Sequence, residues 1–335
     1  MKILPVNLSS QPADKKEQTK IFPVIDSHVD LIYMMMRQAP EVQFCNLANN
    51  QITPQKLRQG NVRVVVSAFY CPDSFNGHLT AVSYLQTLWS YAKRNMQGLF
   101  TISTADELDM YYHSDIGPGA LLLIENADAL VDLNFADLKK YGFKGVGLTH
   151  AGKNRIGDGN SVKNPSGLTK KGRQLVSKIN RLKFFIDVAH LSEPCFWETV
   201  DIFDGPLISS HTGFKRFCDL PRNLSDRQMQ VLIKRRGIIG VTVNPEMLTI
   251  NNQPATIIDV FRQIDWFVQK FGVNNVGIGS DFGGFDVVNQ GLEHHGRFIG
   301  LIELFTRYGY PNDGIAKIMG GNWYRFYTAL LRNAD

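Results

Sequence analysis

The feature that most constrains the fold is a regular alternation of short apolar runs with segments of helical periodicity. The apolar runs are rich in β-branched residues and predict strands; they occupy residues 22–29, 62–70, 119–125, 143–149, 183–189, 205–210, 237–243 and 276–281. Helical spacing is found at residues 80–96, 168–182, 192–203, 225–236 and 257–271. Because parallel strands are joined by crossover connections that usually contain a helix, this alternation predicts an α/β protein with a parallel sheet.

Side-chain patterns mark where some of these helices begin. Ser225 followed by Gln228 forms a capping-box pattern, and Ser192 followed by the acidic Glu193 is a candidate N-cap. The segment from about residue 297 to residue 331 predicts two or three further helices that close the structure.

Eight strands with intervening helices over roughly 250 residues predict a closed (β/α)8 TIM barrel, whose active site lies at the C-terminal ends of the strands. An open doubly wound sheet is the alternative. No GxGxxG turn follows the first strand, so a dinucleotide-binding fold is not favoured. We therefore expect a barrel followed by C-terminal helices.

Composition and charge limit the class of protein further. A chain of 335 residues with 44% hydrophobic residues is long and apolar enough to form a large core. We predict one domain over residues 22–335 after a flexible arm at residues 1–21. The formal charge of +5 is mild and its basic residues are scattered, which does not indicate a nucleic-acid partner. The short apolar start at the N-terminus resembles neither a signal peptide nor a membrane span. These features predict a cytoplasmic protein that binds neither nucleic acid nor membrane.

The cysteines do not indicate a disulfide framework or a cysteine zinc site. Four are present, and none is in a CxxC pair. We interpret them as reduced thiols: Cys45, Cys71, Cys195 and Cys218.

Potential metal ligands and proton carriers stand where the predicted strands end. The first strand ends in "VIDSHVDLIY", where His28 and Asp30 are two residues apart and project to the same side of an extended segment. The ends of later strands carry Glu125, His150, His190, His211 and Asp281. Taken singly, each has an ordinary explanation, such as a turn, a cap or a buried histidine. A common site explains them all together, since half of the eight histidines fall at these few positions.

Imidazole and carboxylate groups suit zinc, manganese or ferrous iron, and a carboxylate can bridge two ions about 3.5 to 4 Å apart. Two such ions need roughly five protein ligands and must leave room for a water. The set that meets this need is His28, Asp30, Glu125, His190 and His211. A metal pair acidifies its bridging water to a nucleophile and polarises a carbonyl group.

The chain resembles the membrane (renal) dipeptidase family of dizinc metallopeptidases, within the amidohydrolase-like barrels, from about Pro23 to Leu331. Individually weak motifs carry the resemblance by their order: "IDSHVD", "LRQGNVRVVVSAFY", "LLLIENADAL", "GVGLTHAGKNRIGDG", "GLTKKGRQLVSKINRLKFFIDVAHLS", "PLISSHTG", "PRNLSD", "VGIGSDFGG", "GLEHHGRF" and "IMGGNWYRFY". The chain is similar to soluble bacterial-type members, since no apolar tail follows "ALLRNAD".

The resemblance implies two divalent metal ions, with zinc as the first expectation, bridged by Glu125. His28 and Asp30 would complete one site, and His190 and His211 the other. The resemblance also implies three roles beside the metals. His150 would stabilise the oxyanion and contact substrate, and Asp281 would transfer the proton to the leaving amine. Arg222 would bind the terminal carboxylate, and Asn223 beside it would also contact the substrate.

Several positions differ from the usual family pattern. Asn126 stands where a glycine usually follows the bridging glutamate, and Gly283 replaces an aspartate in "DFGG". Pro245 and Glu246 occupy a loop in which some relatives carry aromatic residues. These differences bear on which substrate the protein accepts.

The leading hypothesis is a dipeptidase that attacks the peptide bond with a metal-bridging hydroxide, with L-Xaa-D-Xaa dipeptides among its candidate substrates. One alternative keeps the dinuclear site but acts on a lactone, a cyclic amide or a phosphoester. Another is an inactive barrel used for binding. A small peptide is the expected ligand, and a homodimer is the expected assembly.

Overall fold

The computed structural model describes residues 20–133, 138, 141–249 and 254–333. In this part of the chain, eight parallel strands follow one another around a closed barrel: β1 (Val24–Val29), β2 (Val62–Tyr70), β4 (Gly119–Glu125), β5 (Phe143–Gly147), β6 (Phe185–Asp187), β7 (Leu207–Thr212), β8 (Ile239–Val241) and β9 (Val276–Ile278). Pairing of β1 with β9, and of β2 with β4, closes the ring. The predicted TIM barrel is confirmed, and each of its strands overlaps one of the apolar runs; β7 alone extends beyond its run, by two residues.

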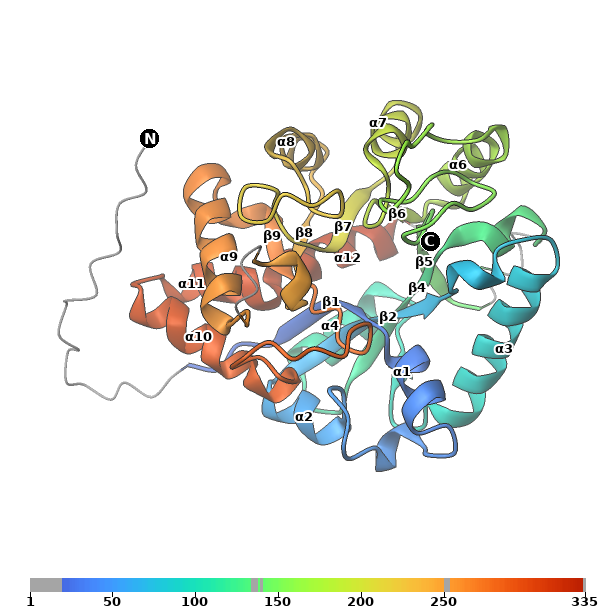
Figure 1. The fold of residues 1–335 in the computed structure, drawn as a ribbon. Coiled ribbons are helices and arrows are strands. Elements are labelled where there is room, and N and C mark those ends of the chain that lie inside the picture. The colour runs from blue at the N-terminus through green and yellow to red at the C-terminus, as the bar shows by residue number, and fades with distance from the viewer. Residues whose placement is uncertain (1–19, 134–137, 139–140, 250–253, 334–335) are drawn as a thin grey trace.

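Helices surround the barrel and link its strands (Figure 1). Those expected from helical spacing are α3 (Thr80–Asn95), α6 (Lys170–Leu182), α7 (Glu193–Ile202), α8 (Asp226–Lys234) and α9 (Ile257–Phe271). The capping box at Ser225 and the N-cap at Ser192 are both confirmed. The expected C-terminal helices are α10 (Phe298–Arg307), α11 (Asn312–Ala316) and α12 (Asn322–Arg332). Within the described residues, no helix is both long and apolar enough to span a lipid bilayer.

Some elements were not expected from the apolar pattern. They are α1 (Leu31–Gln38), α2 (Pro54–Gln59), α4 (Ala105–His113) and a two-residue strand, β3 (Phe100–Thr101), that pairs with the start of β4. Most of the predicted N-terminal arm, residues 1–19, lies outside the described residues.

Alternate residues of the strands pack into two different cores. Val64, Leu121 and Leu123 belong to a cluster that also includes Trp323 and Tyr327 of α12, so they fill the barrel interior. Their neighbours along the strands pack outward against the surrounding helices. The interior is therefore filled by side chains, which confines any ligand to one end of the barrel.

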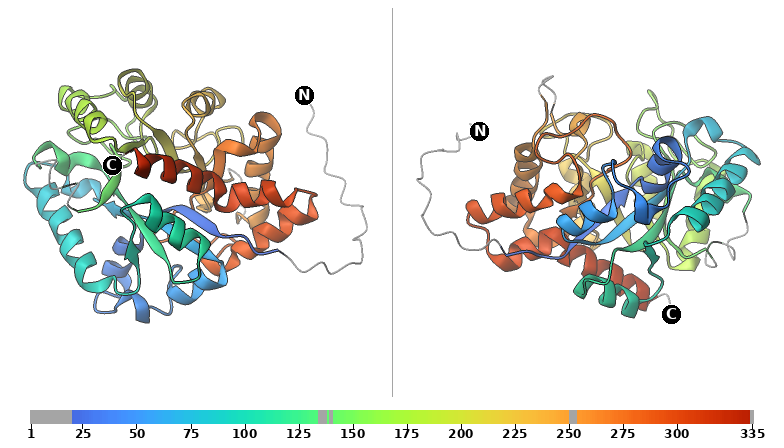
Figure 2. Two further views of the ribbon diagram at one scale, coloured as in Figure 1. Left: turned by 180° about the vertical axis from the view of Figure 1, so that it is seen from behind. Right: turned by 90° about the horizontal axis from the view of Figure 1, so that it is seen from below.

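The C-terminal helix α12 covers the end of the barrel where the strands begin. Trp323 Nε1 donates a hydrogen bond to the carbonyl oxygen of Ile278, at 3.0 Å. Tyr324 stacks on Tyr112 of α4 with a centroid distance of 4.5 Å, and the views from behind and below show these two helices side by side (Figure 2). Because this end is closed, the opposite end, where the strands finish, is the open one.

Candidate metal centre

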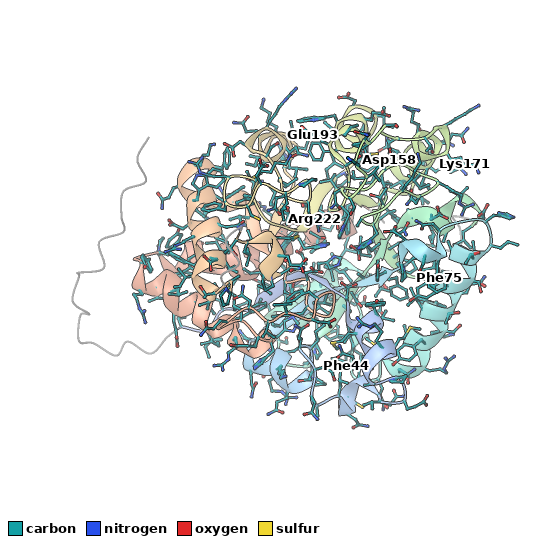
Figure 3. The ribbon with its side chains drawn as sticks, in the orientation of Figure 1. Phe44, Phe75, Asp158, Lys171, Glu193 and Arg222 are labelled. Atoms are coloured by element: carbon teal, nitrogen blue, oxygen red, sulfur yellow. The ribbon has the colours of Figure 1, made fainter. Side chains whose placement is uncertain are left out.

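A cavity of about 330 Å³ opens at the C-terminal ends of the barrel strands. Its lining includes Asp30, Tyr33, Arg37, Tyr70, Glu125, His150, Asn160, His190, Leu220, Arg222, Asn244, Glu246, Met247 and Asp281. Arg222 lies near the middle of the molecule, whereas Lys171 lies on an outer helix (Figure 3). The cavity is of the size that binds small molecules.

His28, Asp30 and Glu125 form the first group of potential ligands. His28 and Asp30 come from the end of β1, and Glu125 is the last residue of β4. His28 Nε2 lies 3.7 Å from Asp30 Oδ2 and 3.5 Å from Glu125 Oε2. All three side chains are buried. Their donor atoms converge closely enough to hold one ion.

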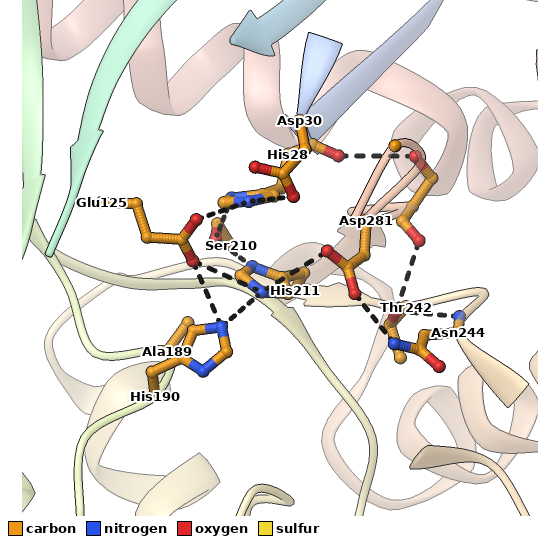
Figure 4. A network of polar contacts seen from close by, with 12 residues as sticks. His28, Asp30, Glu125, Ala189, His190, Ser210, His211, Thr242, Asn244 and Asp281 are labelled. Atoms are coloured by element: carbon orange, nitrogen blue, oxygen red, sulfur yellow. Dashed lines mark hydrogen bonds and ion pairs between the residues drawn. The ribbon is translucent and has the colours of Figure 1, made fainter. Parts of the chain in front are cut away.

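Glu125, His190 and His211 form the second group (Figure 4). Glu125 Oε1 lies 3.2 Å from His190 Nε2 and 3.9 Å from His211 Nε2. The two histidine Nε2 atoms are 3.1 Å apart. Glu125 thus presents one carboxylate oxygen to each group, which is the placement that a bridging ligand requires.

A divalent cation fits the chemistry of these donors. Within the described residues, His28 Nε2 and Asp30 Oδ1 are buried without a hydrogen-bond partner. Such unpaired buried polar atoms are costly unless a ligand satisfies them. Burial and the nearby positive charges lower the pKa values of His190 and His211 well below the usual value, so both rings are neutral. Neutral imidazole is the form that binds a metal.

Glu125 is held in the ionised form that a metal ligand needs. Burial alone would raise its pKa, but the charge of His28 and the hydrogen bond from His190 lower that pKa well below its usual value. Burial likewise opposes protonation of His28, yet Glu125 and Asp30 raise the pKa of its imidazole. Glu125 and Asp30 therefore concentrate negative charge around His28. Negative charge at this place favours a bound cation.

Asp281 lies opposite Glu125, three residues after β9. Its Oδ1 is 4.0 Å from His211 Nε2, and its Oδ2 accepts a hydrogen bond of 3.0 Å from Asn244 Nδ2. Burial, with the negative charge of Asp30, raises its pKa to about 7. A carboxyl group with such a pKa can both take up and release a proton near neutral pH.

His150 also lines the cavity and is oriented by an aspartate. Its Nδ1 is 3.1 Å from Asp73 Oδ2, which also accepts a hydrogen bond of 2.8 Å from the Gly152 backbone. The His150 ring packs on Tyr70 and His190. Burial opposes protonation of His150, but Asp73 and Glu125 raise its pKa. A charged or donating imidazole is thereby turned toward the cavity.

Arg222 and Asn223 are adjacent in sequence, but only the Arg222 side chain lines the cavity. Arg222 lines the cavity, and its Nη2 donates to the carbonyl oxygen of His211 at 2.9 Å. Asn223 is buried: its amide nitrogen donates to the carbonyl oxygens of Cys218 and Met247, and its Oδ1 accepts from the Gly213 backbone. We expected Asn223 to contact substrate. Its side-chain amide instead forms three hydrogen bonds to the backbone and so connects the segments around Gly213, Cys218 and Met247.

Asn223→Ala should therefore reduce stability rather than substrate affinity. Losing these bonds should cost about 3 kcal/mol of unfolding free energy, since buried backbone groups are left unpaired. The midpoint of urea unfolding measures this effect, with the exposed Asn312→Ala as the matched control. An unchanged midpoint together with a raised KM would instead assign Asn223 to substrate binding.

Three residues at the site have left-handed backbone conformations. The φ angles are 65° at His190, 68° at Asp281 and 71° at Asn126. Such conformations cost non-glycine residues of order 1 kcal/mol and gather at functional sites. Asn126 stands where the family usually has glycine, and asparagine tolerates this region best among the other residues. Its amide also donates to the carbonyl oxygen of Cys71 and to Asn76 Oδ1.

The two other departures from the family pattern also have structural explanations. Gly283 has φ 89°, and a Cβ there would lie 2.8 Å from the carbonyl oxygen of Asp30. The backbone therefore favours glycine at this position. Pro245 begins a short 3-10 turn, and Glu246 lines the cavity from that turn.

The residues that orient His150, Asp281 and the potential ligands were not identified from the sequence. They are Asp73, Asn160, Asn244, Asp187 and Ser210. Asp73 and Asn244 could have been suggested by their places shortly after predicted strands. Asn160 could not, because it lies in a long loop and its contact with His190 Nδ1, at 3.3 Å, depends on tertiary structure.

A closed (β/α)8 barrel with this buried group of histidines and carboxylates at its open end defines the class of barrel metallohydrolases. The chain belongs to the membrane dipeptidase family, peptidase family M19, whose sequence model matches residues 14–334. An uncharacterized Klebsiella pneumoniae protein in the pqqA 5′ region is 30% identical over 181 residues, which cover 51% of this chain and 66% of that protein. Mouse Dipeptidase 3 (Mus musculus) is 25% identical over 92% of this chain and 64% of its own length.

This chain thus spans about two-thirds of the length of these two curated relatives. Among solved structures, a Rhodobacter sphaeroides metallopeptidase bound to a phosphinate mimic of the dipeptide L-Ala-D-Ala superposes with a TM-score of 0.83 at 22% identity. The match covers 94% of this chain and all of that one (100%), and it supports the barrel fold.

Proposed function

We propose that this protein is a dipeptidase that uses two divalent metal ions, of which zinc is the first expectation. Glu125 would bridge the ions, with His28 and Asp30 on one and His190 and His211 on the other. The observation that carries the proposal is the placement of Glu125, whose two carboxylate oxygens face two separate groups of donors. The metals, when bound, supply a Lewis acid for the peptide carbonyl and an acidified water.

The residues around the ligands have separate tasks in this proposal. Arg222 binds the terminal carboxylate of the substrate through its guanidinium fork. His150, oriented by Asp73, donates to the oxygen that becomes negative in the tetrahedral intermediate. Asp281, with its pKa near 7, delivers a proton to the amine that leaves. The small cavity limits the substrate to a short peptide.

Turnover of dipeptides tests the proposal directly. Protein loaded with zinc or manganese should hydrolyse members of a panel of L-L and L-D dipeptides, and His190→Ala should lose this activity. The L-Ala-D-Ala mimic in the Rhodobacter sphaeroides enzyme is the reason to include L-D dipeptides. Failure of the metal-loaded protein to cleave any dipeptide would exclude a dipeptidase. The cytoplasmic location and the homodimer stay predictions.

Arg222→Ala should specifically weaken recognition of the free carboxylate. A lost charged hydrogen-bonding pair costs about 2 kcal/mol, which lowers kcat/KM for a dipeptide about 30-fold. The same dipeptide with a C-terminal amide serves as the control substrate, and its kcat/KM should change far less. Equal losses on both substrates would show that Arg222 acts through the backbone of His211 instead. Activity on a lactone or phosphoester that ignores Arg222 would favour the alternative hydrolase.

A further inference from the structure

Ser210 contacts both groups of potential metal ligands. Its side chain is completely buried in β7, and its Oγ lies 3.1 Å from His28 Nδ1 and 2.8 Å from His211 Nδ1. The same oxygen forms a hydrogen bond with Asp187 Oδ2. One hydroxyl thus contacts the imidazole of a histidine in each group (Figure 4).

The number of protons on Ser210, Asp187 and the two histidines determines which atom donates and which accepts in each hydrogen bond. A serine hydroxyl has one proton to donate and two lone pairs that accept. Asp187 Oδ1 already accepts from the backbone nitrogens of Ser210 and Ala189, at 2.9 and 3.0 Å, so Asp187 is surrounded by donors. The hydroxyl proton therefore goes to Asp187, and the two lone pairs of Ser210 accept from the two histidine Nδ1–H groups.

We propose that Ser210 is a positioning residue that fixes one tautomer in a histidine of each metal site. With the proton of each ring on Nδ1, the lone pair of Nε2 points at Glu125 and the cavity, where a metal would bind. The inference rests on the proposed function, since it concerns the ligands of that metal pair. Hydrogen bonds of this kind orient histidine ligands and increase their basicity.

The backbone of Ser210 is itself held in place by three strands. A Cβ at Gly240 would lie 1.9 Å from the Ser210 carbonyl oxygen, and one at Gly279 only 1.8 Å from it. Ser27 Oγ of β1 donates to the same oxygen at 2.6 Å. Close approach of β1, β8 and the residue that follows β9 therefore holds the Ser210 backbone, from which the hydroxyl projects, as the geometry of a metal site requires.

Ser209 offers a matched control in the same strand. It is also completely buried, but its Oγ has no hydrogen-bond partner among the described residues. Ser209→Ala and Ser210→Ala remove the same atom from adjacent residues, so general effects on strand β7 are shared by both variants. Only Ser210→Ala removes the acceptor for the two histidines.

The first test is zinc affinity, measured by competition with a chromophoric chelator. Ser210→Ala should bind both zinc ions about 10- to 100-fold more weakly, and Ser209→Ala should bind them as the unaltered protein does. Unchanged affinity in Ser210→Ala, or weakening of only one of the two ions, would overturn the inference while leaving the dipeptidase proposal intact. If the unaltered protein binds no zinc, both proposals fail.

The second test reads the protons of the two histidine rings directly. In zinc-loaded protein labelled with ¹⁵N-histidine, NMR should show His28 and His211 with a proton on Nδ1 and the metal on Nε2. A ring that lacks the Nδ1 proton in either residue would overturn the inference, whether or not Ser210→Ala folds. Because a metal on Nε2 by itself leaves the proton on Nδ1, the contact with Ser210 is read from the Nδ1–H resonances. These resonances should shift for both rings in Ser210→Ala and for neither ring in Ser209→Ala, a difference that a merely structural role of Ser210 would not produce.

Discussion

Glu125→Gln should abolish dipeptide hydrolysis and remove the metals together. Glu125 is the residue that faces both groups of donors, with Oε2 3.5 Å from His28 Nε2 and Oε1 3.2 Å from His190 Nε2. Glutamine has the same shape but no charge and only one acceptor oxygen. Metal catalysis supplies several kcal/mol, and each 1.4 kcal/mol is a factor of ten, so kcat/KM should fall about 1,000-fold or more.

The measurement combines steady-state kinetics with metal analysis of the same sample. Glu303→Gln, an exposed change of the same kind in α10, is the matched control and should keep full activity and full metal content. If Glu125→Gln retained two ions per chain, Glu125 would not be the bridging ligand, however strongly activity fell.

Asp281→Asn should leave the metals bound but slow the chemical step. The substitution preserves the size of the side chain and its contact with Asn244, and removes the proton that Asp281 exchanges near its pKa of about 7. General acid–base catalysis contributes about 100- to 10,000-fold, so kcat should fall by that factor with little change in KM.

Metal content separates this result from damage to the centre. The expected outcome is two ions per chain in Asp281→Asn with a greatly reduced kcat. Asp313→Asn, on the exposed surface of α11, controls for the loss of one negative charge. Loss of metal in Asp281→Asn would make Asp281 a ligand or a support for one, and a normal kcat would remove it from proton transfer.

Most of the barrel could be predicted from the sequence because its strands are buried on both faces. Such strands read as continuous apolar runs, and β2 and β4 have the predicted boundaries. The runs at 183–189 and 237–243 are longer than β6 and β8, since pairing stops before the apolar residues do. Helices with an apolar stripe, such as α9, were equally clear.

The unexpected helices have local reasons. Helix α1 begins directly after Asp30 with no side-chain cap, so its apolar residues look like a continuation of the first strand. Helix α4 does carry a signal, a capping box between Thr104 and Glu107. Thr53 before Pro54 is a similar signal for α2. Short helices of this kind can be found from their caps rather than from periodicity.

The potential ligands could be predicted because parallel strands of a barrel end at one rim. Residues at the ends of strands far apart in sequence, such as His28 and His211, are therefore neighbours in space. The residues that orient them could not be predicted in the same way. Ser210 reads as an ordinary strand serine, just like Ser209, and only the folded structure distinguishes the one that contacts two histidines.

The most direct measurement is the metal stoichiometry of purified protein reconstituted with zinc and then freed of loosely bound ions. Elemental analysis should find two zinc ions per chain, and fewer in His190→Ala. Retention of no zinc would contradict the proposed centre, and the cluster of histidines and carboxylates at the rim would need another explanation.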